Sequence, residues 1–234
     1  MSTASKKRSK RLKYEKLKNK RLVKKYYWLA PREWWSGKIC KDYDYSYIHW
    51  GWCPGWDKTF GQMFMDELGQ AIKESGQKNF TIDQIKEKYG RMCCYTGGCC
   101  QKAHDIISKY EMISQNVCMY CGCEAPMLDD GWMYVACLDC FKKIYRNREK
   151  YVKNAVPKTD EEITEIWEKI IIDKPDEDGK YHIPLTYKYT QFYPDKEKEI
   201  VTVDISDTVK KIRKRINGYK GRRRDGTVTE SNFS

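Results

Sequence analysis

The length and composition of the chain exclude several classes of protein. With 234 residues, the chain can bury one substantial core or two small ones, so its size does not force it to depend on cross-links or metals. Aromatic residues make up 14% of the chain, too many for a disordered polyelectrolyte. We find neither the roughly 20 consecutive apolar residues of a membrane span nor the apolar segment of a signal peptide. The sequence therefore predicts a soluble, intracellular protein without a membrane partner.

Positive charge is concentrated at the two ends of the chain. The formal net charge is +12, yet residues 1–25 alone hold twelve Lys and Arg against one acid, Glu15. Residues 210–224 add nine Lys and Arg and no acid, which leaves a net charge of −8 for the rest of the chain. The sequence therefore predicts a mildly acidic body with a basic segment at each end.

The first 76 residues predict two helices separated by an irregular segment. Residues 6–25 can form a helix, although their charge density makes it marginal in isolation, and we expect it to order on a partner. Residues 26–56 are rich in Trp and Tyr but lack periodicity, which predicts an irregular layer packed on the core. Asp57 is expected to cap a helix that runs to about Ser75 and ends at Gly76.

The remaining elements alternate between hairpins and helices. Segments 80–88 and 91–96 predict a β-hairpin and are followed by a helix over 103–114. A basic helix is expected over 141–154, and a capping box at Thr159 and Glu162 opens another that runs to about residue 172. Segments 187–192 and 200–205 predict a second hairpin. Ser206 then caps a final helix, which Gly218 and Gly221 are expected to break.

These elements predict an α+β fold with a small antiparallel sheet, amphipathic helices and a four-cysteine zinc module. The predicted parts are a basic N-terminal arm (1–25), an aromatic-rich α+β core (26–117), the zinc module with its helix (118–154), a C-terminal α+β subdomain (155–209) and a basic C-terminal tail (210–234).

Four cysteines have the spacing of a structural zinc site. Cys118 and Cys121 form one C-x2-C pair, and Cys137 and Cys140 form a second after fifteen intervening residues. The x2 spacing lets two thiolates of a tight knuckle converge on one ion, and Cys140 lies where a helix begins, whose positive end favours a thiolate. Four thiolates leave no open position for water, so the sequence predicts one structural Zn²⁺ in a treble clef or zinc ribbon.

A second group of cysteines, Cys93, Cys94, Cys99 and Cys100, could hold a second metal. Adjacent cysteines of a strand point to opposite faces, so at most one thiol of each pair converges easily. The alternative is that these residues are small core side chains of a two-sided strand.

Several of these features occur together in one known group of proteins. The features are Gly55-Trp56 before a helix, segment 85–90, Tyr95, Ile113-Ser114, Cys118-x2-Cys121-Gly122, Gly131-Trp132 and Cys137-x2-Cys140. This combination resembles uncharacterised zinc-ribbon or treble-clef small proteins of tailed bacteriophages and prophages, over about residues 50–141. The resemblance implies a phage-derived protein in the cytoplasm of the infected host cell or in the virion. It implies no activity, and the second cysteine group, both basic ends and residues 150–209 depart from its pattern or lie outside it.

Motifs of the common enzyme classes are missing from the sequence. His49, His104 and His182 lie at no ligand or nuclease spacing from one another, and there is no phosphate-binding loop, nucleophile elbow or dinucleotide fingerprint. An enzyme would need the cysteines of 93–100 to form a redox or open metal centre. The sequence therefore predicts a non-enzymatic protein.

The basic ends predict binding to nucleic acid. They could neutralise phosphates at a spacing fixed by the body, with steep salt dependence and little sequence preference, and Tyr14, Tyr26, Tyr27 and Trp28 could stack on unpaired bases. The candidate phosphate-binding residues are Lys6, Lys7, Arg8, Lys10, Arg11, Lys13, Arg21, Lys210, Lys211, Arg213, Lys214, Arg215, Arg222, Arg223 and Arg224.

Two alternatives stay open at this point. The basic ends could merely solubilise the chain or bind acidic proteins without specificity. Alternatively, the protein could be an adaptor that binds a host or phage protein, for example in host transcription or defence machinery, or a minor virion component. Removing both ends would leave binding of a protein partner intact but abolish binding of nucleic acid.

Overall fold

The computed structural model of the protein describes residues 3–33, 35–43, 45, 53–153, 156–191 and 199–223. These residues form an α+β structure with small two-stranded sheets, as the sequence predicts. The chain divides into two compact units: unit 1 comprises Met1–Trp52, Met63–Lys88 and Met92–Glu111, and unit 2 comprises Cys53–Gln62, Tyr89–Arg91 and Met112–Ser234. The five-part division along the chain stays a prediction.

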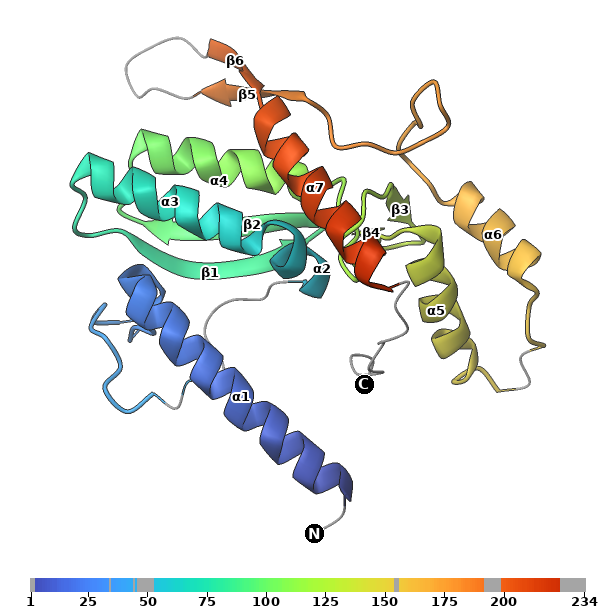
Figure 1. Cartoon of the computed structure of the whole chain (residues 1–234), viewed down its shortest axis with the longest axis horizontal. Coiled ribbons are helices and arrows are strands. Elements are labelled where there is room, and N and C mark those ends of the chain that lie inside the picture. The colour runs from blue at the N-terminus through green and yellow to red at the C-terminus, as the bar shows by residue number, and fades with distance from the viewer. Residues whose placement is uncertain are drawn as a thin grey trace. The chain divides into compact units, whose positions relative to one another are not determined.

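Unit 1 is built on two helices and a hairpin (Figure 1). Helices α3 (Gln62–Ser75) and α4 (Gln101–Ser114) lie side by side along the hairpin of β1 (Thr81–Lys88) and β2 (Arg91–Gly97). Phe64 and Leu68 of α3 are fully buried, and the Phe64 ring packs edge-on against Tyr110 of α4. The amphipathic spacing expected for both helices therefore does build a core.

The basic N-terminal segment is a helix, as predicted: α1 runs from Thr3 to Lys25. Its last residues are tied to α3, because Lys25 forms an ion pair with Asp66 at 2.9 Å and the Tyr26 hydroxyl donates to the same carboxylate at 2.6 Å. Trp28 follows in a short 3₁₀ helix (Tyr27–Leu29) and lies over Gly69, where an added Cβ would come within 3.1 Å of the indole. From Ala30 to Cys53 the predicted irregular layer is irregular where the structure describes it, with one isolated bridge between Arg32 and Ile39. The prediction was wrong for its last three residues, Pro54–Trp56, which are helical.

The helix expected to start at Asp57 begins one turn earlier. Helix α2 (Pro54–Trp56) continues through a π-helical turn (Asp57–Gly61) into α3. Pro54 occupies the first helical position, where its fixed φ and missing N–H suit a helix start. Asp57 itself has helical dihedrals, so the prediction of Asp57 as the cap was wrong.

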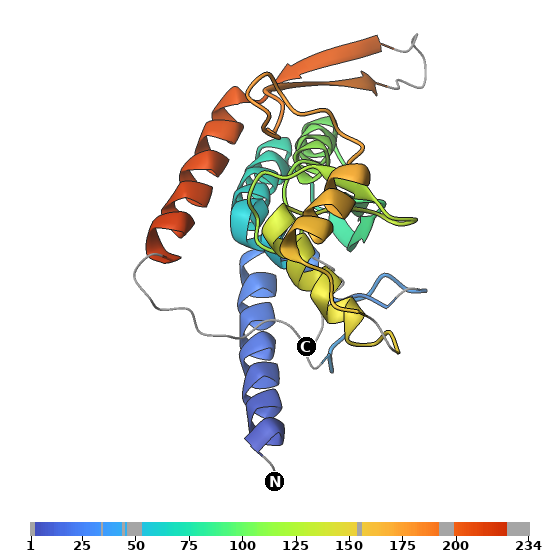
Figure 2. The same ribbon diagram turned by 90° about the vertical axis from the view of Figure 1, so that its right-hand side faces the viewer.

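Besides α2, the described part of unit 2 contains the C-x2-C pairs, two further hairpins and helices α5 to α7 (Figures 1 and 2). Strands β3 (Met127–Asp129) and β4 (Met133–Val135) pair antiparallel and lead into α5 (Leu138–Glu149). Helix α6 (Asp160–Lys169) opens with the predicted capping box, and β5 (Thr186–Gln191) pairs antiparallel with β6 (Glu199–Asp204). Figure 2 shows this last hairpin extending away from the start of α7 (Ser206–Arg223).

Three helices in unit 2 differ from the predictions in their ends. Helix α5 runs over Leu138–Glu149 rather than 141–154, because the Tyr151 and Val152 N–H groups donate to carbonyls only three residues back. Helix α6 stops at Lys169 rather than near residue 172, because Ile171 pairs with Leu128 of β3 and the Ile172 N–H donates to the Met127 carbonyl. Three residues thus leave the helix to extend the β3–β4 sheet. Helix α7 runs through Gly218 and Gly221 to Arg223, so the predicted break was wrong. A glycine costs only about 1 kcal/mol in a helix interior, which packing elsewhere along the helix can offset.

Among the described residues, no helix combines the length and apolar character needed to cross a membrane. The buried residues of unit 2 gather instead around β3, β4 and the first turn of α5, with Leu128, Val135 and Phe141 almost completely enclosed. This core lies directly against the cysteine pairs.

Candidate metal centre

The first cysteine pair lies on a tight backbone knuckle. The Cys118 N–H donates to the Cys123 carbonyl at 2.8 Å, and the Gly122 N–H donates to the Cys118 carbonyl at 3.0 Å. Gly122 has a φ of +83°, a conformation that a residue with a Cβ adopts only under strain. Gly122 therefore lets the backbone turn directly after Cys121 without strain.

Helix α2 and the π-turn after it hold this knuckle through three hydrogen bonds. The Gly55 N–H donates to the Met119 carbonyl at 2.8 Å, the Trp56 indole to the Val117 carbonyl at 2.9 Å, and the Thr59 hydroxyl to the Gly122 carbonyl at 2.8 Å. The backbones touch at Gly55, where an added Cβ would lie only 2.1 Å from the Cys118 carbonyl oxygen. Gly55-Trp56 is therefore a support of the knuckle.

The second pair lies at the start of α5. Cys137 is the residue before the helix, with extended dihedrals, and Cys140 lies buried in the first turn. The Met119 N–H donates to the Val135 carbonyl at 2.9 Å, which joins the first knuckle to the end of β4 just before Cys137. Backbone hydrogen bonds thus bring the two pairs to one place.

Four thiols lie close enough to share a metal ion. The Sγ atoms of Cys118, Cys121, Cys123 and Cys137 all lie within 4.8 Å of one another. The Cys121 sulfur is 3.4 Å from that of Cys123 and 3.6 Å from that of Cys137. Four sulfurs around one ion at bonds of 2.3 Å would lie about 3.8 Å apart in a tetrahedron. The spacing of the thiols therefore fits a tetrahedral ion with little movement.

The gathered set differs from the predicted set in one member. Three predicted ligands, Cys118, Cys121 and Cys137, belong to it, whereas Cys123 was not predicted. Cys140 does not belong to the mutually close group, although it lies in the same buried cluster as Cys118. Its role as a ligand stays a prediction. Cys123 follows Gly122 outside both C-x2-C pairs, so the motif gave no reason to include it.

The thiols perturb one another strongly. Hydrogen bonds from Cys118, and then from Cys123, Cys137 and Cys140, lower the pKa of the Cys121 thiol. Hydrogen bonds with Cys118 and Cys121 raise the pKa of Cys123 and of Cys140. Protonated thiols of the cluster thus stabilise a thiolate at Cys121. Ionising the other thiols as well requires a nearby cation to offset the repulsion between thiolates. Thiolates in such a set suit a soft or borderline ion.

The second cysteine group is not assembled in the same way. Cys93 and Cys94 lie on β2, where the Cys94 N–H donates to Glu111 at 2.9 Å. Burial first, and then the Glu111 carboxylate, raises the pKa of Cys94, and burial also raises the pKa of Cys99. Within the described ranges, the cluster around Cys121 is the only close group of three or more ligands. Metal binding by Cys93, Cys94, Cys99 and Cys100 stays a prediction.

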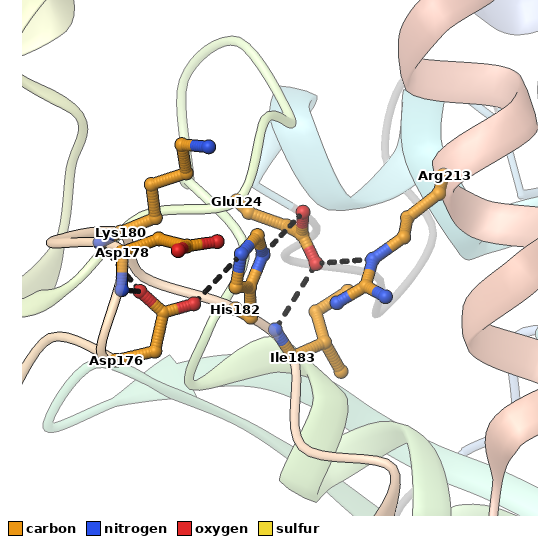
Figure 3. Close-up of polar contacts among 7 residues, drawn as sticks. All are labelled: Glu124, Asp176, Asp178, Lys180, His182, Ile183 and Arg213. Carbon is orange, nitrogen blue, oxygen red and sulfur yellow. Dashed lines mark hydrogen bonds and ion pairs between the residues drawn. The ribbon is translucent and has the colours of Figure 1, made fainter.

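A polar network beside the first knuckle was not predicted (Figure 3). Glu124 accepts from Arg213 Nε at 2.9 Å and from the Ile183 N–H at 3.1 Å, and its other oxygen lies 3.2 Å from His182 Nδ1. His182 Nε2 faces Asp176 at 3.0 Å. Glu124 follows Cys123 directly, so these contacts join α7 and the loop before β5 to the cysteine knuckle. They link residues 58 and 89 positions apart, which no local pattern could indicate.

The candidate phosphate-binding residues have different surroundings. Lys10, Lys13 and Arg21 are exposed on α1, as are Lys210, Lys211 and Lys214 on α7, and Arg215 is half-buried. Arg213 instead pairs with Glu124 and so is not available to a phosphate without breaking that pair. The side chains of the other candidates, Lys6, Lys7, Arg8, Arg11, Arg222, Arg223 and Arg224, lie outside the described side chains, as does His49.

Two of the four aromatic residues proposed to stack on bases are in the core. Tyr26 is 4% exposed and Trp28 is 5% exposed, and the Trp28 ring lies 6.0 Å from that of Phe80. The prediction that these two side chains stack on bases was therefore wrong. Tyr14 and Tyr27 are exposed.

Comparisons with known proteins give no relative. No family model, no curated protein and no solved structure matches the chain. The resemblance to small phage and prophage proteins accordingly stays a prediction.

Proposed function

We propose that the chain is a non-enzymatic, zinc-stabilised, phage-derived protein that binds DNA or RNA mainly through its basic ends, in the cytoplasm of the infected host cell. One observation carries this proposal. Helix α1 extends over 23 residues and contains twelve Lys and Arg but a single acid, Glu15. Cations at this density repel one another along a helix, and a polyanion relieves that repulsion.

The dimensions and exposure of α1 support this role. At 1.5 Å per residue the helix is about 35 Å long, comparable to one turn of a nucleic-acid duplex. Its C-terminal end is fixed to α3 by the contacts of Lys25 and Tyr26 with Asp66, while Lys10, Lys13 and Tyr14, nearer the other end, are exposed. A helix held at one end can present its cations to phosphates over the remaining turns.

Helix α7 supports a second, smaller contribution. Val209, Ile212 and Ile216 are buried, so the helix turns an apolar face inward, while Lys211 and Lys214 are exposed. Because Arg213 is paired with Glu124, we expect the exposed lysines rather than this arginine to meet phosphates.

The zinc ion proposed for the cysteine cluster would be structural. Cys118 and Cys121 on the first knuckle and Cys137 before α5 would hold it, with Cys123 or Cys140 completing the set. The ion would supply a cross-link between these elements, and four thiolates would leave it no position for a water. Its proposed effect is to keep unit 2 rigid.

The test is a binding titration of fluorescently labelled single strands and duplexes of mixed sequence over a series of salt concentrations. The triple variant K10E/K13E/R21E changes only exposed side chains of α1 and should weaken binding severely. The matched control K78E/K150E/K153E makes the same change in net charge at exposed positions elsewhere. Equal losses in both variants, or affinity that does not fall with salt, would contradict binding through α1.

A protein-binding adaptor is the second candidate, and one observation favours it. Tyr89 and Trp132 are 55% and 59% exposed, and their ring centroids lie 5.9 Å apart at the tips of two hairpins. The adjacent, exposed Asp129 makes this surface better suited to a basic peptide than to phosphates.

The discriminating variant must spare the core. Cutting the chain at residue 210 would remove the buried Ile212 and Ile216, so charge removal in K210Q/K211Q/K214Q replaces that deletion. Combined with loss of the α1 cations, it should abolish nucleic-acid binding. A protein partner captured by intact protein, retained by this variant and lost by Y89A/W132A would favour the adaptor.

A further inference from the structure

We infer that Cys123 and Cys140 compete for one position on the bound ion, so that the centre is a five-thiol site for a thiophilic metal. The inference rests on the proposed zinc centre and goes beyond it, since the C-x2-C motif assigns four fixed ligands. In this centre the fourth ligand is either Cys123, on the first knuckle, or Cys140, in the first turn of α5.

The placement of the thiols carries this inference. The mutually close group, in which all sulfurs lie within 4.8 Å, contains Cys123 together with Cys118, Cys121 and Cys137. Cys140 lies outside that group but in the same buried core cluster, in the first turn of α5 and three residues after Cys137. Three thiols thus form a common base, and two others lie beside that base. A tetrahedral ion on the base has room for one of the two.

Both competitors lie on hydrogen-bonded backbone. The Cys123 carbonyl accepts from the Cys118 N–H at 2.8 Å, which fixes the end of the knuckle. Cys140 lies in the first turn of α5, where the Phe141 N–H donates to the Cys137 carbonyl at 2.9 Å. We therefore expect exchange to occur by rotation of the two side chains between staggered positions.

Burial distinguishes the two competitors. Cys140 is 5% exposed, whereas Cys123 is only partly buried. When Cys140 binds the ion, the displaced thiol of Cys123 is therefore partly accessible to solvent. When Cys123 binds the ion, the displaced thiol of Cys140 stays buried. A spare thiol of either kind keeps the ion bound if the other is lost.

The test uses Co²⁺ as a probe of the full-length chain under reducing, oxygen-free conditions. Thiolate-to-cobalt charge-transfer absorbance grows with the number of bound thiolates, and ligand-field bands report tetrahedral geometry. We expect C123S and C140S each to keep the absorbance of the unsubstituted protein. The charge-transfer absorbance of the double variant C123S/C140S should fall to about three quarters of that value, because three thiolates remain out of four.

Cys121→Ser is the matched control. Its loss leaves Cys118 and Cys137 with one of the two competitors, which share a single position on the ion, so three thiolates remain and the absorbance should fall as in the double variant. If C121S retains full absorbance, the three-thiol base is wrong.

The outcomes separate this inference from the proposed centre. A loss of absorbance in C123S alone, in C140S alone or in both single variants overturns the competition. Because Cys140 is buried, Cys140→Ala is made as well and folding is followed by circular dichroism. Failure of both Cys140 variants to fold with metal, while C123S folds, also overturns it. If the unsubstituted protein gives no tetrahedral cobalt spectrum, the metal centre itself is wrong.

Discussion

Substitution of Gly55 by alanine tests how α2 supports the cysteine knuckle. The new Cβ would lie 2.1 Å from the Cys118 carbonyl oxygen and 2.7 Å from the Gly122 nitrogen. Both neighbours are backbone atoms, so α2 or the knuckle must move by about 1 Å to restore ordinary contact, and such overpacking costs about 1–3 kcal/mol. The same movement weakens the hydrogen bond from Gly55 to Met119, at about 1 kcal/mol. We therefore expect the free energy of unfolding to fall by about 2–4 kcal/mol.

Urea unfolding of the zinc-loaded protein, followed by circular dichroism, measures this loss. If the whole loss falls on the metal-bound state, zinc affinity measured against a chelator drops by about 100-fold for 3 kcal/mol. Gly218→Ala is the control, because nothing lies within 4 Å of an added Cβ there and the residue is inside α7. That variant should be unchanged or up to about 1 kcal/mol more stable. A Gly55→Ala protein within about 0.5 kcal/mol of the unsubstituted one would refute the close packing of α2 on the knuckle.

Three further predictions concern single contacts of unit 2. Trp56→Phe keeps most of the packing but leaves a buried carbonyl unpaired, which should cost about 1–3 kcal/mol in urea unfolding; no change would mean that water replaces the indole. Glu124→Gln removes the ion pair between Glu124, whose side chain is 17% exposed, and Arg213, whose side chain is 36% exposed. We therefore expect the free energy of unfolding to fall by about 1 kcal/mol, and by less in high salt. The pKa of Asp160 is lowered first by its hydrogen bond from Arg146, so its ion pairing stabilises the fold above the unfolded pKa near 4 and is lost as pH falls through the lower folded value. Asp160→Asn should therefore be less stable than the unsubstituted protein at pH 7 and equal to it below the folded pKa, and a difference that persists in acid would exclude the ion pair as its cause.

Local signals account for the elements that were predicted correctly. The capping box at Thr159 and Glu162 is confirmed because its two hydrogen bonds involve residues three positions apart. The β1–β2 hairpin is confirmed because Tyr89 and Gly90 both adopt positive φ in its two-residue turn. Amphipathic spacing likewise gave α3 and α4.

The differences arise where distant residues decide the local structure. Ile170–Ile172 continue a helical pattern, yet they pair with β3, a partner more than forty positions away. Asp57 is a good cap in isolation, but Pro54 starts the helix earlier and Gly55 and Trp56 bond to the knuckle.

The candidate site was predictable to the extent that its ligands obey a spacing rule. The C-x2-C rule found Cys118, Cys121 and Cys137, which the fold brings together. It could not find Cys123, because a Cys-Gly-Cys sequence acquires meaning only when the knuckle turns both thiols to the same side. Nor could it find Glu124, whose partners come from α7 and the loop before β5.

Native mass spectrometry of freshly purified protein, before and after a wash in about 1 M salt, tests the central proposal most directly, since salt displaces phosphate contacts but not a thiolate-bound ion. We predict one zinc ion per chain in both spectra and nucleic acid only in the first. A chain that carries no metal, or nucleic acid that survives the wash unchanged, would contradict the proposal of a zinc-stabilised protein that binds nucleic acid through its basic ends.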